Sequence, residues 1–378
     1  MTSLRYDVVV AGLGAMGSAT IAQLALRGKR VLGLERWMPG HPYGSSHGDS
    51  RIIREMYFEH PMYVPLVRRA HELWRELEER TGASLMNTVG GLMIGPENGS
   101  LVQGTLRSAR EHALPFEVLD ATETARRYPA FGLRDGDVAV FDPRAGHLDP
   151  EACNAAHLKV ASKHGAELRF DEPLISWSAD GEGVSVRTEY GSYSADRLVL
   201  SVGARTKGFV PDLPLDVERQ AVFWFEPADA HNYDGDRFPI WAHEYIPGEI
   251  CYGFPKHARG VKAAVMHSGE IVVDPDVVTR EIKSEEVEPL RQALAGVLPS
   301  LAVARVVDQD TCLFTNTPDH DFIIDFHPEH PQVLVSSPCS GHGFKFASAI
   351  GELQAELVTE GGSSVDISSF SIRRFLRA

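Results

Sequence analysis

The sequence predicts an α/β protein in which a doubly wound, dinucleotide-binding domain carries a second, β-rich domain. Three observations lead to this prediction. A strand–turn–helix–strand unit occupies residues 5–35, and another buried-strand pattern follows far downstream at 197–202. Between about 215 and 310 the chain shows strand-like alternation of apolar and polar residues. Separated α/β segments with inserted β-rich pieces indicate a discontinuous two-domain fold.

The first unit is read from its hydrophobic pattern. Tyr6 to Ala11 (YDVVVA) is a short β-branched run, typical of a buried parallel strand. Ala15 to Arg27 carries apolar residues at helical spacing, and Gly28 ends that helix. Arg30 to Leu34 is a second strand, so residues 5–35 form one βαβ unit.

The later elements follow from the same patterns. We expect helices at 63–80, 285–298 and 343–360, strands at 166–170, 197–202 and 333–336, a hairpin at 183–193, and mixed strands and loops over 85–145. The dinucleotide-binding domain is therefore expected to comprise residues 1–84, 146–214 and 311–378, and the second domain residues 85–145 and 215–310.

Composition narrows the function classes. The formal net charge of -15 disfavours nucleic-acid binding and docking on an anionic membrane surface. No apolar run approaches the roughly 18 residues needed to span a membrane. The four cysteines are widely spaced and form no CxxC pair, so a zinc site is not expected and a reducing compartment is favoured. A cytoplasmic enzyme without a resident metal is the expectation.

The turn Gly12-Leu13-Gly14-Ala15-Met16-Gly17 is a G-x-G-x-x-G motif in the right context. It follows a strand, opens a helix and precedes the acidic Glu35 at the end of the next strand. Gly12 allows the turn, Gly14 lets the backbone approach a diphosphate, and Gly17 permits close helix–strand packing. The helix N-terminus would bind the diphosphate and Glu35 the ribose hydroxyls. A glycine-rich turn in an ordinary α/β protein is the alternative. FAD and NAD both use this motif, and its place at the N-terminus, with the rest of the domain far downstream, favours FAD.

Three longer segments resemble signatures of one family, that of monomeric sarcosine oxidase and N-methyltryptophan oxidase. They are Gly44–Arg54 (GSSHGDSRIIR), Thr311–Asp319 (TCLFTNTPD) and Ser340–Phe346 (SGHGFKF). The resemblance covers nearly the whole chain in the same order. It implies a glutathione-reductase-like FAD-binding domain, a β-rich substrate domain and a monomer. It also implies oxidation of a secondary amine, such as an N-methyl or cyclic amino acid, by O2 to an imine and hydrogen peroxide.

The resemblance assigns roles to individual residues. Cys312 matches a cysteine bonded covalently to the flavin, although a buried structural cysteine is the alternative. Lys262 resembles a lysine that promotes reaction of the reduced flavin with O2, because a fixed cation stabilises superoxide. Taken alone, Lys262 would be read as a solvated surface lysine.

The substrate site is assigned in the same way. Arg54 and Lys345 resemble the pair that holds the substrate carboxylate, and Tyr252 is placed beside the substrate. The residues implied to act in catalysis are Lys262, Arg51, His47 and His267. The residues implied to bind the cofactor are Gly12, Gly14, Ala15, Met16, Gly17, Glu35, Arg36, Ser45, His47, Ser50, Arg51, Leu174, Gly203, Cys312, Gly341, Gly343, Phe344 and Lys345.

Some positions depart from the family pattern and leave the substrate open. Phe314 stands where the sarcosine enzyme carries a tyrosine, and Ala242 replaces a larger side chain near the substrate. Three other functions also stay open at this point. They are a flavin dehydrogenase that uses an acceptor other than O2, an NAD-dependent dehydrogenase, and a flavin-binding protein without catalytic activity.

Overall fold

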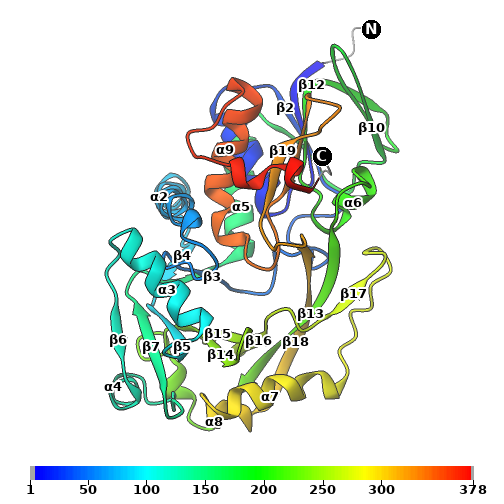
Figure 1. Cartoon of the computed structure of the whole chain (residues 1–378). Coiled ribbons are helices and arrows are strands. Elements are labelled where there is room, and N and C mark those ends of the chain that lie inside the picture. Colours follow the sequence, from blue (N-terminus) through cyan, green and yellow to red (C-terminus); the bar gives the residue numbers. More distant parts are fainter. Residues whose placement is uncertain (1–4, 376–378) are drawn as a thin grey trace.

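The structure is a computed structural model that describes residues 5–375. Within this range the strands form sheets of eight, nine and three strands. Figure 1 shows the eight-stranded sheet in the upper part of the molecule, near both chain ends, and the nine-stranded sheet in the lower part.

The eight-stranded sheet has a parallel centre. Its strands run in the order β9 (Glu167–Arg169), β2 (Val31–Leu34), β1 (Arg5–Ala11), β12 (Ser192–Leu200) and β20 (Val333–Ser337). The central strands are almost fully buried on both faces, which explains their largely apolar sequences. The predicted doubly wound α/β fold is confirmed.

Antiparallel strands complete this sheet. The hairpin β10 (Ser176–Asp180) and β11 (Gly183–Arg187) continues into β12, and β19 (Ile323–Phe326) pairs antiparallel with β20. The hairpin predicted at 183–193 therefore forms between β11 and the start of β12.

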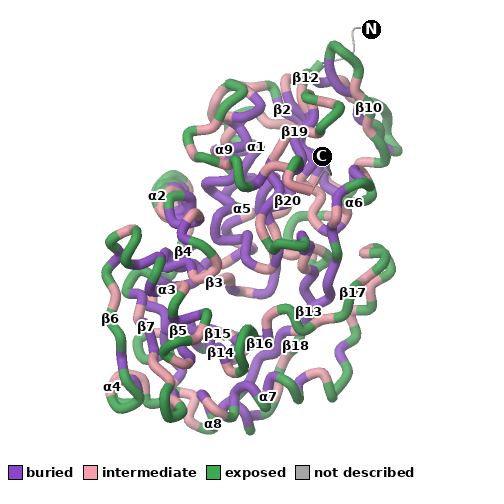
Figure 2. The backbone as a smooth tube through the Cα atoms, in the orientation of Figure 1, coloured by how far each residue is buried: buried purple, intermediate pink, exposed green. Residues whose placement is uncertain are grey.

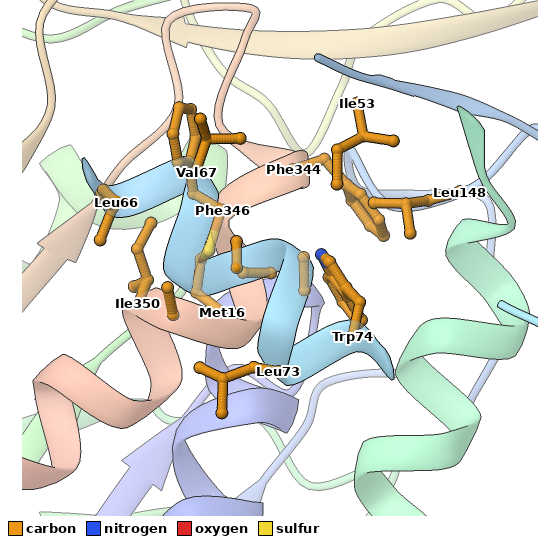
Figure 3. Packing of buried hydrophobic residues seen from close by; sticks show 14 of the residues in the cluster. Met16, Ile53, Leu66, Val67, Leu73, Trp74, Leu148, Phe344, Phe346 and Ile350 are labelled. Carbon is orange, nitrogen blue, oxygen red and sulfur yellow. The ribbon is translucent and has the colours of Figure 1, made fainter. Parts of the chain in front are cut away.

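Helices cover one face of the parallel strands. Helix α1 (Ala15–Leu26) packs against α5 (Pro150–Lys163) and α9 (Ala347–Glu360), and α9 packs against α2 (Val64–Thr81). Figure 3 shows buried side chains of α1, α2 and α9 packed together, with Trp74 of α2 facing Phe344. Because α1 is enclosed by other elements, ten of its twelve residues are buried and its pattern lacks a polar face.

The nine-stranded sheet forms the second half of the molecule. Its order is β17-β13-β16-β15-β14-β5-β7-β6. Strand β18 pairs with β13 along its whole length. The bounds are β5 Gly91–Pro96, β6 Glu117–Leu119, β7 Asp137–Asp142, β13 Asp216–Glu226, β14 Ile240–Ile246, β15 Glu249–His257, β16 Gly260–Val265, β17 Glu270–Val272 and β18 Arg305–Asn316. Helix α7 (Glu288–Ala295) and the short α8 (Pro299–Ala302) pack in the core on one side of this sheet.

A small sheet joins the two halves. It consists of β3 (Arg51–Ile53), β8 (Gly146–Leu148) and β4 (Met86–Thr88). In Figure 2, which colours buried residues purple, the central strand β8 is buried along its length, whereas β3 is partly and β4 mostly accessible. No helix in residues 5–375 is long and apolar enough to cross a membrane.

The predicted mixture of strands and loops over 85–145 is incomplete. That segment also holds α3 (Ser100–Glu111) and α4 (Ala121–Arg127). In α3 the buried Leu101, Val102, Thr105, Leu106 and Ala109 recur at helical spacing, a signal that could have revealed the helix.

The short helix α6 (Thr206–Phe209) and α5 were also not predicted. Asp149 begins α5 by accepting a hydrogen bond from the Ala152 N–H, and Pro150 takes the first turn, which is a helix-start signal. The boundary predicted at residue 311 falls inside β18. The division into domains stays a prediction.

The approach of α1 to β1 generates a stability prediction. A Cβ added at Gly17 would lie 1.8 Å from the Gly12 carbonyl oxygen, so backbone must move. We expect Gly17→Ala to lower the free energy of unfolding by about 1–3 kcal/mol through overpacking. This is the net loss, after subtraction of the gain in helix propensity of about 1 kcal/mol. Thermal unfolding measures the difference, with Gly132→Ala as control because that position faces open space. An unchanged melting temperature for Gly17→Ala would contradict the packing argument.

Candidate functional site

A cavity of about 520 Å³ lies where the eight-stranded and nine-stranded sheets meet. Its lining comes from the loops after β1, β2, β12 and β20 and from one face of the nine-stranded sheet. The carboxyl ends of parallel strands β1, β2, β12 and β20 meet at one edge, which is where doubly wound sheets bind ligands.

The glycine turn forms one end of this cavity. Gly12 has a φ of 85° and a Cβ there would meet the Ser201 carbonyl oxygen at 2.3 Å, so glycine is required. Gly14 lines the cavity and is the N-cap residue of α1, where it offers no capping side chain; the Ala15 N–H donates to the Ser46 hydroxyl at 3.1 Å. A helix N-terminus that faces a cavity without a capping residue fits a diphosphate.

Glu35 stands beside this turn, at the end of β2. Its carboxylate accepts hydrogen bonds from the Leu13 N–H at 2.7 Å and the Trp37 N–H at 3.2 Å. Burial favours the neutral acid, but His41 and these N–H groups together hold the pKa of Glu35 below its usual value. The carboxylate is therefore charged and fixed in direction.

Three buried polar atoms on the cavity wall have no partner among the described residues. They are Trp37 Nε1, His47 Nε2 and Asn154 Oδ1. Because buried polar groups are normally hydrogen-bonded, they indicate a polar ligand in the cavity. Together with the uncapped helix and Glu35, they fit the size and polarity of a dinucleotide such as FAD.

The middle of the cavity holds Arg51, Lys262 and Cys312. Lys262 is 4% exposed, and its ammonium donates to the carbonyl oxygens of Gly48 at 2.6 Å and Ser50 at 3.1 Å. Burial, followed by the Arg51 charge, lowers the pKa of Lys262 well below its usual value. The surface-lysine alternative is wrong for this residue.

Cys312 lies on β18 with its Sγ 3.7 Å from Arg51 Nη2. Arg51 is held by hydrogen bonds to the carbonyl oxygens of Ser45 and Ser50. A fixed guanidinium therefore lies beside the Cys312 sulfur.

Arg54 and Lys345 line the same cavity, and both are 5% exposed. Arg54 binds the Glu59 carboxylate through Nη2, at 2.6 and 2.9 Å. Burial disfavours the charged form of Glu59, but Arg54, His342 and Lys345 hold its pKa below the usual value. Burial and Arg54 lower the pKa of Lys345 to about 7. This part of the cavity therefore already binds one carboxylate, which belongs to the protein.

The opposite wall is apolar and belongs to the nine-stranded sheet. Ile250, Tyr252 and Phe254 alternate along β15 on the cavity face, and Ala242 of β14 pairs with Tyr252. Two buried cations facing an apolar wall suit a small organic acid with a hydrocarbon part.

Almost all residues predicted for the site line this cavity. They are Gly12, Gly14, Ala15, Met16, Glu35, Arg36, Ser45, His47, Ser50, Arg51, Arg54, Leu174, Gly203, Tyr252, Lys262, Cys312, Gly341, Gly343, Phe344 and Lys345. Their roles stay predictions.

The remaining two predicted residues, Gly17 and His267, do not line it. Gly17 faces the backbone of Gly12, as its predicted packing role requires. His267 lies beyond Phe314, with Nδ1 3.3 Å from the Glu218 carboxylate.

Sequence reasoning missed Glu59, Asn154, Tyr57 and His342. Asn154 lies on the helix that was not predicted. Glu59 lies five residues after Arg54 in the sequence. This short spacing between a basic and an acidic residue was the signal that could have revealed their ion pair. Tyr57 was not recognisable, because its partner His342 is 285 residues away.

A family model described as FAD dependent oxidoreductase matches residues 7–357. The chain belongs to this family. It is therefore an FAD-dependent oxidoreductase, and the NAD alternative is wrong.

Two curated relatives match this chain over nearly their full length. The chain is 40% identical to a protein named monomeric sarcosine oxidase from Streptomyces avermitilis, covering 100% of this chain and 99% of that one. It is 36% identical to N-methyl-L-tryptophan oxidase from Yersinia pestis, covering 98% and 100%. The resemblance inferred from the three motifs is confirmed.

Solved structures show the same fold. NikD, described as an unusual amino acid oxidase essential for nikkomycin biosynthesis, superposes with a TM-score of 0.85 at 28% identity, covering 97% of each chain. Glycine oxidase from Geobacillus kaustophilus superposes with a TM-score of 0.81 at 20% identity, covering 99% of this chain and 100% of that one, which supports the fold alone.

The ion pair of Glu59 and Arg54 leads to a prediction. Glu59→Gln removes the internal carboxylate that competes for Arg54, so a ligand carboxylate should bind about tenfold more tightly. The unliganded variant should be less stable, since a buried cation loses its partner. Calorimetric titration with a carboxylate ligand measures the first effect, and thermal unfolding the second. Glu72→Gln, which pairs with Arg69 on the exposed face of α2, is the control. Equal or weaker binding by Glu59→Gln would contradict the competition.

Proposed function

We propose that the enzyme oxidises a secondary amine that carries a carboxylate, an N-methyl or cyclic amino acid, with O2 as electron acceptor. The observation that carries the proposal is the pairing of two buried cations, Arg54 and Lys345, with an apolar wall inside the cavity that begins at the glycine turn. The relatives named for sarcosine and N-methyl-L-tryptophan oxidation support this substrate class.

The residues around the glycine turn would hold FAD, with the diphosphate at Gly12 to Met16 and the ribose at Glu35. The redox chemistry is that of FAD, which accepts two electrons and can return them to O2. Overall, the amine loses two electrons and two protons, O2 gains them as hydrogen peroxide, and water hydrolyses the imine.

The protein supplies orientation and charge. Arg54 presents a planar guanidinium fork to the substrate carboxylate, and Lys345 adds a second positive charge. Glu59 must release Arg54 when the substrate carboxylate binds. The walls around Phe58, Ala242, Ile250 and Met266 exclude water from the hydrocarbon part of the substrate.

Lys262 supplies the positive charge for the reaction with O2. Two backbone carbonyl oxygens fix its Nζ, and the rings of Trp224 and Phe254 lie 5.3 and 5.0 Å from it. A fixed cation in a water-poor site stabilises negative charge that develops on oxygen during O2 reduction.

A substrate panel with a peroxide readout tests the proposal. Sarcosine, N-methyltryptophan, pipecolate and proline are each supplied to the purified holoenzyme, and the corresponding amines without a carboxylate serve as controls. At least one acid should yield one equivalent of peroxide per amine oxidised. Amine oxidation that reduces an added dye but yields no peroxide would identify a dehydrogenase instead.

We further propose that Cys312 is the covalent attachment point of FAD, through its sulfur. Acid precipitation of the wild-type protein should retain the flavin, whereas Cys312→Ser should release it into the supernatant. Cys339→Ser is the matched control, since Cys339 also lines the cavity, but burial raises its pKa to about 11 and disfavours the thiolate. Flavin released from the wild-type protein by acid would refute the attachment.

The role of Lys262 gives the next prediction. Lys262→Met should slow flavin reoxidation by O2 by roughly 100-fold or more, because a preorganised charge is lost. Reduction by substrate without oxygen should change little. Stopped-flow spectroscopy separates the two half-reactions. Lys256→Met on the exposed side of β15 is the control, and equal reoxidation in the two variants would remove Lys262 from this role.

A further inference from the structure

Lys345 belongs to a buried chain of hydrogen bonds. Its Nζ donates to the His342 carbonyl oxygen at 2.7 Å and lies 3.4 Å from Tyr57 Oη. Tyr57 Oη lies 2.6 Å from His342 Nδ1, and His342 Nε2 lies 3.0 Å from the His320 carbonyl oxygen. Tyr57 is fully buried and His342 is 7% exposed, so water does not replace these contacts.

The directions of these hydrogen bonds follow from chemistry. A carbonyl oxygen only accepts, so His342 Nε2 must carry a hydrogen and donate it to His320. Burial lowers the pKa of His342 to about 4, so at neutral pH the ring has only this hydrogen. Nδ1 is therefore an acceptor, and the Tyr57 hydroxyl donates to it. The hydroxyl has a single hydrogen, which this 2.6 Å bond uses, so Tyr57 cannot also donate to the His342 carbonyl oxygen that lies 3.4 Å away.

The phenolic oxygen then has only lone pairs left for Lys345. A protonated lysine has three N–H groups. Within residues 5–375, its hydrogen bonds end on the His342 carbonyl oxygen and on Tyr57 Oη. The third N–H remains for a ligand, and Lys345 lines the cavity.

We infer that Tyr57 and His342 are positioning residues that hold Lys345 in the orientation required to bind the substrate carboxylate. The inference rests on the proposed function, since it takes the carboxylate as the ligand of Lys345. A neutral tyrosine–histidine pair suits this task, because it offers an acceptor without adding a negative charge that would compete with the substrate. Glu59, by contrast, does compete, through its ion pair with Arg54.

Tyr57 and His342 also affect the pH range in which Lys345 binds a carboxylate. The charged or titratable groups that face Lys345 are Arg54, Glu59, Tyr57 and His342. The pKa of Lys345 is lowered to about 7 by burial and Arg54, with Glu59 opposing. Free enzyme therefore loses this proton as the pH rises through about 7. Carboxylate binding is strongest below that pH and weakens above it. The Tyr57 oxygen favours the ammonium, so its loss should move the weakening to lower pH.

The test is calorimetric titration of the holoenzyme with benzoate, an amine-free carboxylate, between about pH 6 and pH 9. Benzamide is the uncharged control ligand. Tyr57→Phe should raise the dissociation constant for benzoate about tenfold, as loss of a hydrogen bond to a charged group does. It should also shift the pH midpoint downward and leave benzamide binding unchanged.

The neighbouring tyrosine offers a matched control. The Tyr63 ring centroid is 4.8 Å from that of Tyr57, but its hydroxyl donates to Asp321 at 2.7 Å and not to Lys345. Tyr63→Phe should therefore bind benzoate as the wild type does. Equal effects of the two substitutions would overturn the inference, because they would indicate general loss of packing.

Substitutions at His342 keep the inference testable if Tyr57→Phe folds poorly. His342→Asn places an acceptor near the position of Nδ1 and should keep benzoate affinity close to that of the wild type. His342→Leu leaves Tyr57 without that acceptor and should weaken benzoate binding as Tyr57→Phe does. Equal affinity in the Asn and Leu variants would overturn the positioning role while the proposed reaction still stands. A wild-type holoenzyme that binds no benzoate at any pH and oxidises no amino acid would overturn the proposed function itself.

Discussion

Positive charge held out of water around one cavity is the constraint on which this structure depends. Arg54, Lys262 and Lys345 are buried, and Arg51 beside them is half-buried. Removing a cation from water is costly unless other groups replace its hydration. Here backbone carbonyl oxygens do most of this, and Glu59 forms an ion pair with one cation. Carbonyl dipoles fix the direction of a cation without cancelling its charge, so the cavity keeps its attraction for anions.

The carbonyl groups must themselves be fixed, and the segment 44–54 accounts for much of this. It lies between the two large sheets, where the Ser45 hydroxyl donates to the Leu313 carbonyl oxygen of β18 and the Gly48 N–H donates to Glu151 of α5. Lys262 of β16 in turn donates to the Gly48 carbonyl oxygen. One loop is thus held by both halves of the molecule, and it carries the arginines into the cavity.

The sequence predicted the parallel strands and their helices well, because a strand buried on both faces must be apolar along its whole length. Residues 6–11 illustrate this rule. The sequence did not reveal α5, because the helix-start signal at Asp149 lies in a segment with a weak apolar stripe. The helix packs between other helices, and tertiary contacts rather than an amphipathic pattern stabilise it.

The sequence by itself determined the glycine turn, the acidic residue that ends β2, and the motifs that carry Arg51, Arg54, Cys312 and Lys345, because each depends on local backbone geometry or on a contiguous run of residues. Only the tertiary structure decided which groups surround each charge. Lys262 is buried because β16 packs beneath segment 44–54, and the hydrogen-bond partner of Tyr57 comes from the far end of the chain. Burial and the direction of hydrogen bonds set the charge state of a lysine, and both arise from contacts between segments that no local pattern records.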